Sequence, residues 1–317
     1  MFETDEQRWP SFTTLILLVI GICLGFIVVG PLVGFLLSLP FYDGSVLELA
    51  ETMQNPVGHP EVRLPIYILQ ATATFVGLIV TPLLLLKAFG RSFVSLFRPF
   101  EFHLIPLVLT TLIVISFMAV NSWFVEWNAG IHFPEALRSF EEWARMNEDQ
   151  RAEMTTFMTT FSSPADLMLA LLVIAVIPAI GEELVFRGLF QNELGYITGN
   201  AHVSIWLAAL LFSAFHVQFF GFVPRLLLGV LFGYLYLWSG SLVLAMFAHF
   251  VNNAFAVLSL YFYQTGAISV SPEEPTSMSL PVVLFAAAMT ALLLMWFRRF
   301  YSQRMPPAAG GVNTGSN

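Results

Sequence analysis

The chain has 317 residues, of which 57% are hydrophobic and only 11% are charged. A soluble domain carries about 25% charged residues, and several uncharged runs here reach about 20 residues, so the composition excludes an ordinary soluble protein. The net charge is −8, and no basic patch interleaved with aromatic residues indicates nucleic-acid binding. The single cysteine, Cys23, excludes a disulfide framework or a cysteine-based zinc site within one chain.

Apolar segments of helical length divide the chain. We predict an all-α, polytopic membrane bundle of about eight transmembrane helices, because no short alternating strands suited to a closed barrel occur. The first segment is expected to be a retained helix and not a signal peptide, because an acidic stretch precedes it and no cleavage site follows. The predicted spans are residues 13–39, 64–88, 103–125, 164–187, 202–220, 222–239, 241–263 and 279–300.

The predicted spans define five segments. Residues 1–12 form a predicted cytoplasmic N-terminal segment, and residues 13–163 hold the N-terminal transmembrane helices with their outer-side loops. Residues 164–263 form a second group of helices, and residues 264–304 form an outer loop and the last helix. The Gly/Pro/Asn-rich tail at 305–317 is predicted to be disordered. The distribution of Lys and Arg at the span ends predicts that both termini are cytoplasmic.

Two further patterns concern packing. The loop at 126–163 carries apolar and aromatic residues at helical spacing, which predicts either a helix at the outer membrane interface or a solvated connector helix. Small residues four apart let two helices approach closely, so we assign such pairs to helix packing. They occur at Gly21/Gly25, Gly30/Gly34 and Gly229/Gly233.

Ionisable and amide side chains occur at a few places inside the spans. A charged group at the bilayer centre costs roughly 2.5–3.5 kcal/mol, so such residues are functional candidates. Span four ends in one group of them, and spans five to seven carry the others: Glu182, Glu183, Arg187, His216, Arg225, His249, Asn252 and Asn253.

Helical spacing separates the three charged residues of span four. Glu183 and Arg187 are four apart, which predicts an ion pair along one face of the helix. Glu182 lies about 100° around the helix from Glu183 and can therefore face a different neighbour.

Helical spacing also sorts the later polar residues. His249 and Asn253 are four apart and should reach the same patch of the bundle interior, whereas Asn252 points elsewhere and is predicted to make a helix–helix hydrogen bond. With Glu182 and His216, they supply a carboxylate, two imidazoles and an amide. A carboxylate can take a proton from water, an imidazole can hold that water, and the remaining groups can donate to an oxyanion. This combination predicts hydrolysis.

Other chemistries use similar residues. Neither G-x-S-x-G nor H-E-x-x-H occurs, so a nucleophile elbow and a thermolysin-like zinc helix are excluded. Two histidines and a glutamate could still bind zinc with an open water position. A proton-linked transporter is an alternative, although it usually has inverted repeats, and none is visible here. A second alternative is a membrane binding or scaffold protein that acts through a partner.

Three short motifs resemble one known family. "EELVFR" (182–187) resembles the EExxxR signature of the CPBP family, the CAAX proteases and bacteriocin-processing enzymes, also called Abi. "FSAFH" (212–216) is similar to the family's F-x-x-x-H motif, and "HFVNN" (249–253) to its histidine with an asparagine four residues on. The resemblance covers roughly residues 165–260. The family includes type II CAAX prenyl endopeptidases and lysostaphin-resistance-like proteins.

The resemblance implies an all-α intramembrane endopeptidase with residues 164–263 as its catalytic core. Its active site would lie in a cavity open toward the cytoplasm. The motifs carry over roles for six residues: Glu182 activates the water, His216 assists, His249 and Asn253 form the oxyanion hole, and Glu183 and Arg187 give support.

The resemblance leaves the cofactor open, since both metal-dependent and glutamate mechanisms are argued for the family. We favour a reaction that requires no cofactor, because His249 and Asn253 are better explained as two donors than as one ligand beside an idle neighbour. The alternative is zinc held by Glu182, His216 and His249. The expected partners are a peptide or membrane-protein substrate and the lipid bilayer, without nucleic acid. The expected location is the bacterial cytoplasmic membrane, and a prenylated substrate is not implied.

Overall fold

The computed structural model of the chain describes residues 11–90, 103–272 and 277–303. The predicted tail at 305–317 and most of the predicted N-terminal segment lie outside these residues. The regular elements within them are helices, and seven helical rods are long and apolar enough to cross a membrane. The protein is therefore a multi-pass helical bundle, as predicted. The seven rods are Phe12–Phe41, Pro60–Ala88, Leu104–Ala129, Pro164–Thr198, Phe222–Ser239, Leu242–Gln264 and Leu280–Ser302.

Three of the rods are composite. The first contains α1 (Ser11–Leu24), η1 (Gly25–Val29), α2 (Gly30–Ser38) and η2 (Leu39–Phe41). The second contains η3 (Pro60–Val62), α4 (Arg63–Phe75), η4 (Val76–Val80) and α5 (Thr81–Ala88). The fourth contains α8 (Pro164–Ala170), η7 (Leu171–Val176), α9 (Ile177–Glu183), η8 (Leu184–Gln191) and α10 (Asn192–Thr198). Of the η segments, η1, η4, η7 and η8 are π-helical turns, and η2 and η3 are 3₁₀ turns.

Proline accounts for three of the four π-helical turns. Pro31, Pro82 and Pro178 each occupy the second position of the helix that follows η1, η4 and η7. A proline inside a helix cannot donate to the carbonyl four residues earlier, and its ring clashes with that carbonyl. Widening the preceding turn relieves this conflict and lets the rod continue across the membrane.

The remaining helices are single. They are α3 (Val46–Thr52), α6 (Leu104–Ala129), η6 (Glu135–Leu137), α7 (Arg138–Met158), α11 (Ala201–Phe215), α12 (Phe222–Ser239), α13 (Leu242–Gln264) and α14 (Leu280–Ser302). The predicted helix within the loop at 126–163 is thus confirmed as α7.

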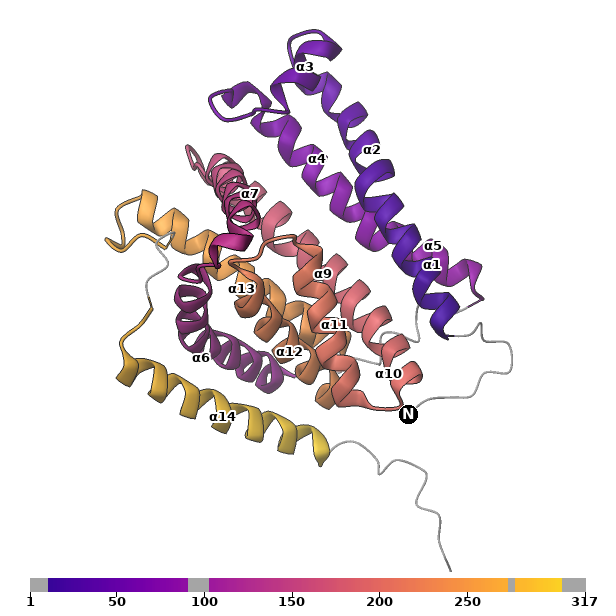
Figure 1. Cartoon of the computed structure of the whole chain (residues 1–317), viewed down its shortest axis with the longest axis vertical. Helices are drawn as coiled ribbons and strands as arrows, with labels where there is room; N and C mark the ends of the chain where they lie inside the picture. The colour runs from indigo at the N-terminus through magenta and orange to yellow at the C-terminus, as the bar shows by residue number, and fades with distance from the viewer. Residues whose placement is uncertain (1–10, 91–102, 273–276, 304–317) are drawn as a thin grey trace, which may run out of the picture.

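The rods form two flanks around a central group. The α1–α2 rod runs beside the α4–α5 rod on one flank, and α14 runs beside α6 on the other, with α9 to α13 between them (Figure 1). The close approach of α2 and α4 depends on glycine. A Cβ atom on Gly30 would lie 2.7 Å from Cα of Ala73, and one on Gly34 would lie 2.9 Å from Cα of Leu69. The packing role predicted for this pair is confirmed.

The fifth predicted span, 202–220, is too long. The helix α11 has 15 residues and ends at Phe215, which at 1.5 Å per residue gives about 22 Å, less than the ~30 Å hydrocarbon core. The chain leaves the helix because Val217 has φ of 52°, a conformation that a β-branched residue rarely adopts. Among the described residues, the bundle therefore has seven long rods and one shorter apolar helix.

Helix α7 is attached to the rods at its C-terminal end. The Tyr67 hydroxyl of α4 donates to the carbonyl of Met158, and Nε2 of Gln264 in α13 donates to the carbonyl of Thr159 at 2.8 Å. These bonds hold the end of α7 against two membrane-spanning rods.

The N-terminal half of α7 is attached to the preceding loop through Glu141. Its carboxylate accepts from the backbone N–H of Phe133 at 2.8 Å and from Arg145 at 2.7 Å. These donors favour the charged form and lower the pKa of Glu141 to about 2.

Candidate active site

The ion pair predicted inside span four is present. Nη1 of Arg187 donates to Oε1 of Glu183 at 2.6 Å, and the two side chains are 1% and 0% exposed. Nη2 of Arg187 donates to the carbonyl of Gly229 in α12 at 2.9 Å. Four residues on, Nε2 of Gln191 donates to the carbonyl of Gly233 at 3.2 Å. Arg187 and Gln191 therefore attach η8 to α12.

Glu183 has a second function in this geometry, because it contacts the imidazole of α13. Its Oε1 lies 2.8 Å from Nδ1 of His249, which is buried. The His249 ring stacks on Phe232 with ring centroids 5.4 Å apart. One carboxylate oxygen thus contacts both an arginine of its own rod and a histidine of another helix. The contact with the histidine could not be predicted from residue spacing on a single helix.

Glu182 faces two histidines from two other elements. Its Oε2 lies 3.8 Å from Nε2 of His216 and 3.8 Å from Nε2 of His249. These distances exceed the 2.7–3.2 Å of a hydrogen bond. The Oε2 atom is buried, and it has no hydrogen-bond partner among the described residues. The structure thus brings together three of the four predicted catalytic residues.

The other nitrogen of each ring fixes its orientation. Nδ1 of His216 lies 2.9 Å from the carbonyl of Phe212, and Nδ1 of His249 lies 2.8 Å from Oε1 of Glu183. A carbonyl and a carboxylate oxygen only accept, so we assign the proton of each ring to Nδ1 from these partners. In the neutral rings, each Nε2 atom, 3.8 Å from Oε2 of Glu182, then carries a lone pair and no proton.

Asn253 lies one turn after His249, but its amide is used elsewhere. Its Nδ2 donates to the carbonyl of Ile174 in η7 at 3.1 Å. Pro178, four residues after Ile174, has no N–H for that carbonyl, so the amide takes its place. Asn252 donates to Oδ1 of Asn253 at 3.1 Å. The prediction that Asn252 makes the helix–helix bond is wrong, because Asn253 makes it.

The loop that follows His216 was not predicted as part of the site. Glu148 of α7 accepts from the backbone N–H of Phe220 at 2.8 Å and from Nε2 of Gln218 at 3.3 Å. Nη2 of Arg225 donates to Oε1 of Gln218 at 2.8 Å. These bonds hold the strained turn at Val217. The polar residues are visible in the sequence, but no local pattern pairs position 148 with position 218.

The three converging atoms fit a zinc ion loosely. Tetrahedral zinc with bonds of about 2.0–2.1 Å sets its ligand atoms about 3.3–3.4 Å apart, so Glu182, His216 and His249 would have to move closer by about half an ångström. The contact of Glu183 with His249 is the kind of support that zinc-bound histidines also have. In the part of the chain that the structure describes, no group of three or more His, Cys, Asp or Glu side chains has metal-site spacing.

Comparison with known proteins identifies the segment that holds these residues. Residues 164–255 match the family described as type II CAAX prenyl endopeptidase Rce1-like. This segment is similar to that family, and we call residues 164–255 the Rce1-like segment. The resemblance predicted from the three motifs is confirmed for it, and all six predicted site residues lie within it. Helix α7 and the rods before it lie outside the Rce1-like segment.

We also compared the chain with curated proteins and with solved structures. A stretch of 105 residues is 30% identical to the uncharacterized protein YpbD of Bacillus subtilis (strain 168). It covers 32% of this chain and 48% of YpbD, so the chain spans about half the length of that relative. No solved structure matches the chain.

Proposed function

We propose that the protein is an intramembrane endopeptidase in which Glu182 activates a water molecule. The observation that carries this proposal is the position of Glu182 Oε2, 3.8 Å from Nε2 of both His216 and His249. With neutral rings, all three atoms are acceptors, so a molecule between them must donate. Water has two O–H groups and lone pairs. The match of residues 164–255 to the Rce1-like family supports a peptidase of the CAAX type.

The reaction adds one water to one peptide bond. Glu182 takes a proton from the water while the water oxygen bonds to the carbonyl carbon of the substrate. His216 holds the water through Nε2, since its Nδ1 is bonded to the carbonyl of Phe212. The C–N bond then breaks as Glu182 gives the proton to the leaving nitrogen. The products are a carboxylic acid and an amine.

The charge that develops on the carbonyl oxygen needs donors. The His249 ring is neutral while the water is held, and it donates from Nε2 once it takes up a second proton from solvent; Glu183 at Nδ1 orients that ring, as the aspartate of a serine-protease triad does. Asn253 has a second N–H beyond the one bonded to Ile174. The substrate in this proposal is a peptide or membrane-protein segment, and a prenyl group on it is not part of the proposal.

The decisive variant is Glu182→Gln, which keeps the volume of the side chain and removes the base. We expect hydrolysis to fall by at least about 10²-fold. The assay uses reconstituted protein and fluorescein-labelled casein in H₂¹⁸O, with mass spectrometry of the fragments. Each new carboxyl group should contain ¹⁸O. Glu51→Gln changes an exposed acid on α3 and should cleave like the natural protein. A Glu182→Gln protein that cleaves at the natural rate would refute the proposal.

Removal of metal tests the alternative with zinc. A zinc ion held by Glu182, His216 and His249 would polarise the carbonyl and activate the water itself. We expect hydrolysis to persist after dialysis against EDTA and 1,10-phenanthroline. Loss of activity that one equivalent of zinc restores would show that the metal-free reaction is wrong.

A further inference from the structure

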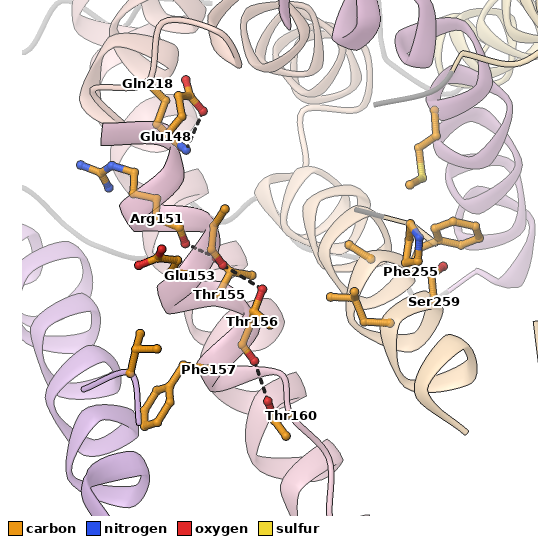
Figure 2. Close-up of a pocket in the computed structure, with 16 residues that line it drawn as sticks. Glu148, Arg151, Glu153, Thr155, Thr156, Phe157, Thr160, Gln218, Phe255 and Ser259 are labelled. Carbon is orange, nitrogen blue, oxygen red and sulfur yellow. Dashed lines mark hydrogen bonds between the residues drawn. The ribbon is translucent and has the colours of Figure 1, made fainter. Parts of the chain in front are cut away.

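A groove lies between α7 and α13 and has a volume of about 870 Å³. Figure 2 shows its two walls facing each other, with Thr155 and Thr156 of α7 and Thr160 just after it on one side, and Phe255 and Ser259 of α13 on the other. None of the predicted catalytic residues lines the groove, so it is distinct from the site described above.

The groove lining includes two residues that lie two positions after predicted site residues in the sequence. Gln218, at one end of the groove, is two residues after His216. Phe255, on the opposite wall, is two residues after Asn253. The groove therefore adjoins the loop that follows His216, because Gln218 belongs to both.

The length of the groove follows from α7. Lining residues run from Glu148, beside Gln218, to Thr160 (Figure 2). The helical residues 148–158 span about 15 Å, and Thr160 lies two residues past the end of α7. An extended peptide rises about 3.3 Å per residue, so this length accommodates about five residues.

The two walls differ in chemistry. The hydroxyl of Thr155 in α7 and that of Thr160 just after it donate to the carbonyls of Arg151 and Thr156 in α7. Their protons are used, and their oxygens can still accept from N–H groups. The other wall is mainly apolar and contains Phe255, Ala256 and Leu260 of α13 and Met118 of α6. An extended peptide matches this lining, because its N–H groups need acceptors and its side chains can be apolar. A lipid acyl chain has no donor for the threonine wall.

We infer that the groove between α7 and α13 binds an extended substrate segment of about five residues on one side of the scissile bond. This inference rests on the proposed peptidase function. The α7 wall lies outside the Rce1-like segment, so part of the choice of substrate is made by residues that the family match does not cover.

The test measures binding without cleavage. A photoreactive p-benzoylphenylalanine replaces Ala152 or Ser259, both of which line the groove, in the Glu182→Gln protein. Gln150, an exposed α7 residue that does not line it, is the matched control position. The probe is a biotinylated pool of random peptides of about ten residues, twice the length that the groove holds. We expect about tenfold more peptide adduct at 152 and 259 than at 150.

The outcomes separate this inference from the proposed function. Peptide adducts confined to positions 152 and 259 support the groove even if casein is never cleaved. Equal labelling at all three positions, or phospholipid adducts that the peptides do not displace, overturns it.

Measurements of KM and kcat provide a second test of the groove. For the peptides that the natural protein cleaves, Ala152→Trp should raise KM about tenfold and leave kcat unchanged, because it fills the groove without touching Glu182. Gln150→Trp should alter neither constant. An unchanged KM in Ala152→Trp would also overturn the inference.

Discussion

Replacing Arg187 by methionine tests whether the buried ion pair is needed for folding. Methionine has an apolar side chain of similar length, but the substitution leaves Glu183, which is 0% exposed, without its cation. Removing one partner of a buried pair costs about 3–5 kcal/mol. The carbonyl of Gly229 also loses its charged donor, which costs about 1–3 kcal/mol when the group stays buried. The contact with His249 remains and offsets part of this loss. We therefore expect destabilisation of about 4 kcal/mol.

A double variant separates the charge from the packing. Glu183→Gln together with Arg187→Met removes both charges and keeps an acceptor for His249. We expect it to be more stable than Arg187→Met alone by about 2 kcal/mol, because no unpaired charge is left. Equilibrium unfolding in mixed dodecylmaltoside and SDS micelles, followed by circular dichroism, measures both values.

The exposed pair of Arg138 and Glu142 provides the control, with both side chains 66% exposed. Arg138→Met should leave the unfolding midpoint nearly unchanged, because water and salt screen this pair. A well-folded Arg187→Met protein, or a coupling energy between positions 183 and 187 below about 1 kcal/mol, would refute the structural role of the buried pair.

Two further predictions concern packing and pH. Gly77→Ala should destabilise the bundle by about 1–3 kcal/mol, since its Cβ would lie 2.5 Å from Cα of Phe26. Gly130→Ala, whose Cβ meets nothing closer than 3.4 Å, is the control in the same unfolding assay. Because the pKa of Glu141 is lowered from 4.5 to about 2, its attachment to the Phe133 N–H should be complete above pH 4.5 and be lost as pH falls through about 2. The ¹⁵N shift of Phe133 should report this transition, and a shift that titrates equally in Glu141→Gln would contradict it.

The fold class could be predicted because a membrane imposes one rule on each span. Apolar runs of about 20 residues locate the rods, and α7 follows from helical spacing in a polar loop. The end of α11 could not be predicted, because the apolar run continues past Phe215 while the backbone turns at Val217. Hydropathy reports the environment of a residue and not its backbone conformation.

The candidate site could be predicted only where one helix decides the geometry. Glu183 and Arg187 pair as their spacing indicates, and Glu182 does face elsewhere. Spacing on α13 placed His249 and Asn253 on one patch but could not show that Asn253 bonds to a carbonyl in η7. That contact depends on the proline of another rod. Similarly, the support of the 216–221 loop by Glu148 comes from a helix that is distant in sequence.

The two bonds from η8 to α12 set a register between these elements. Arg187 and Gln191 are four residues apart, and so are the carbonyls of Gly229 and Gly233 that accept from them. A slide of one residue would break both bonds at once and leave a buried guanidinium and a buried amide without these acceptors. These bonds therefore fix the position of Glu182 along the bundle relative to α12. A motion that preserves these two bonds has to move η8 and α12 together.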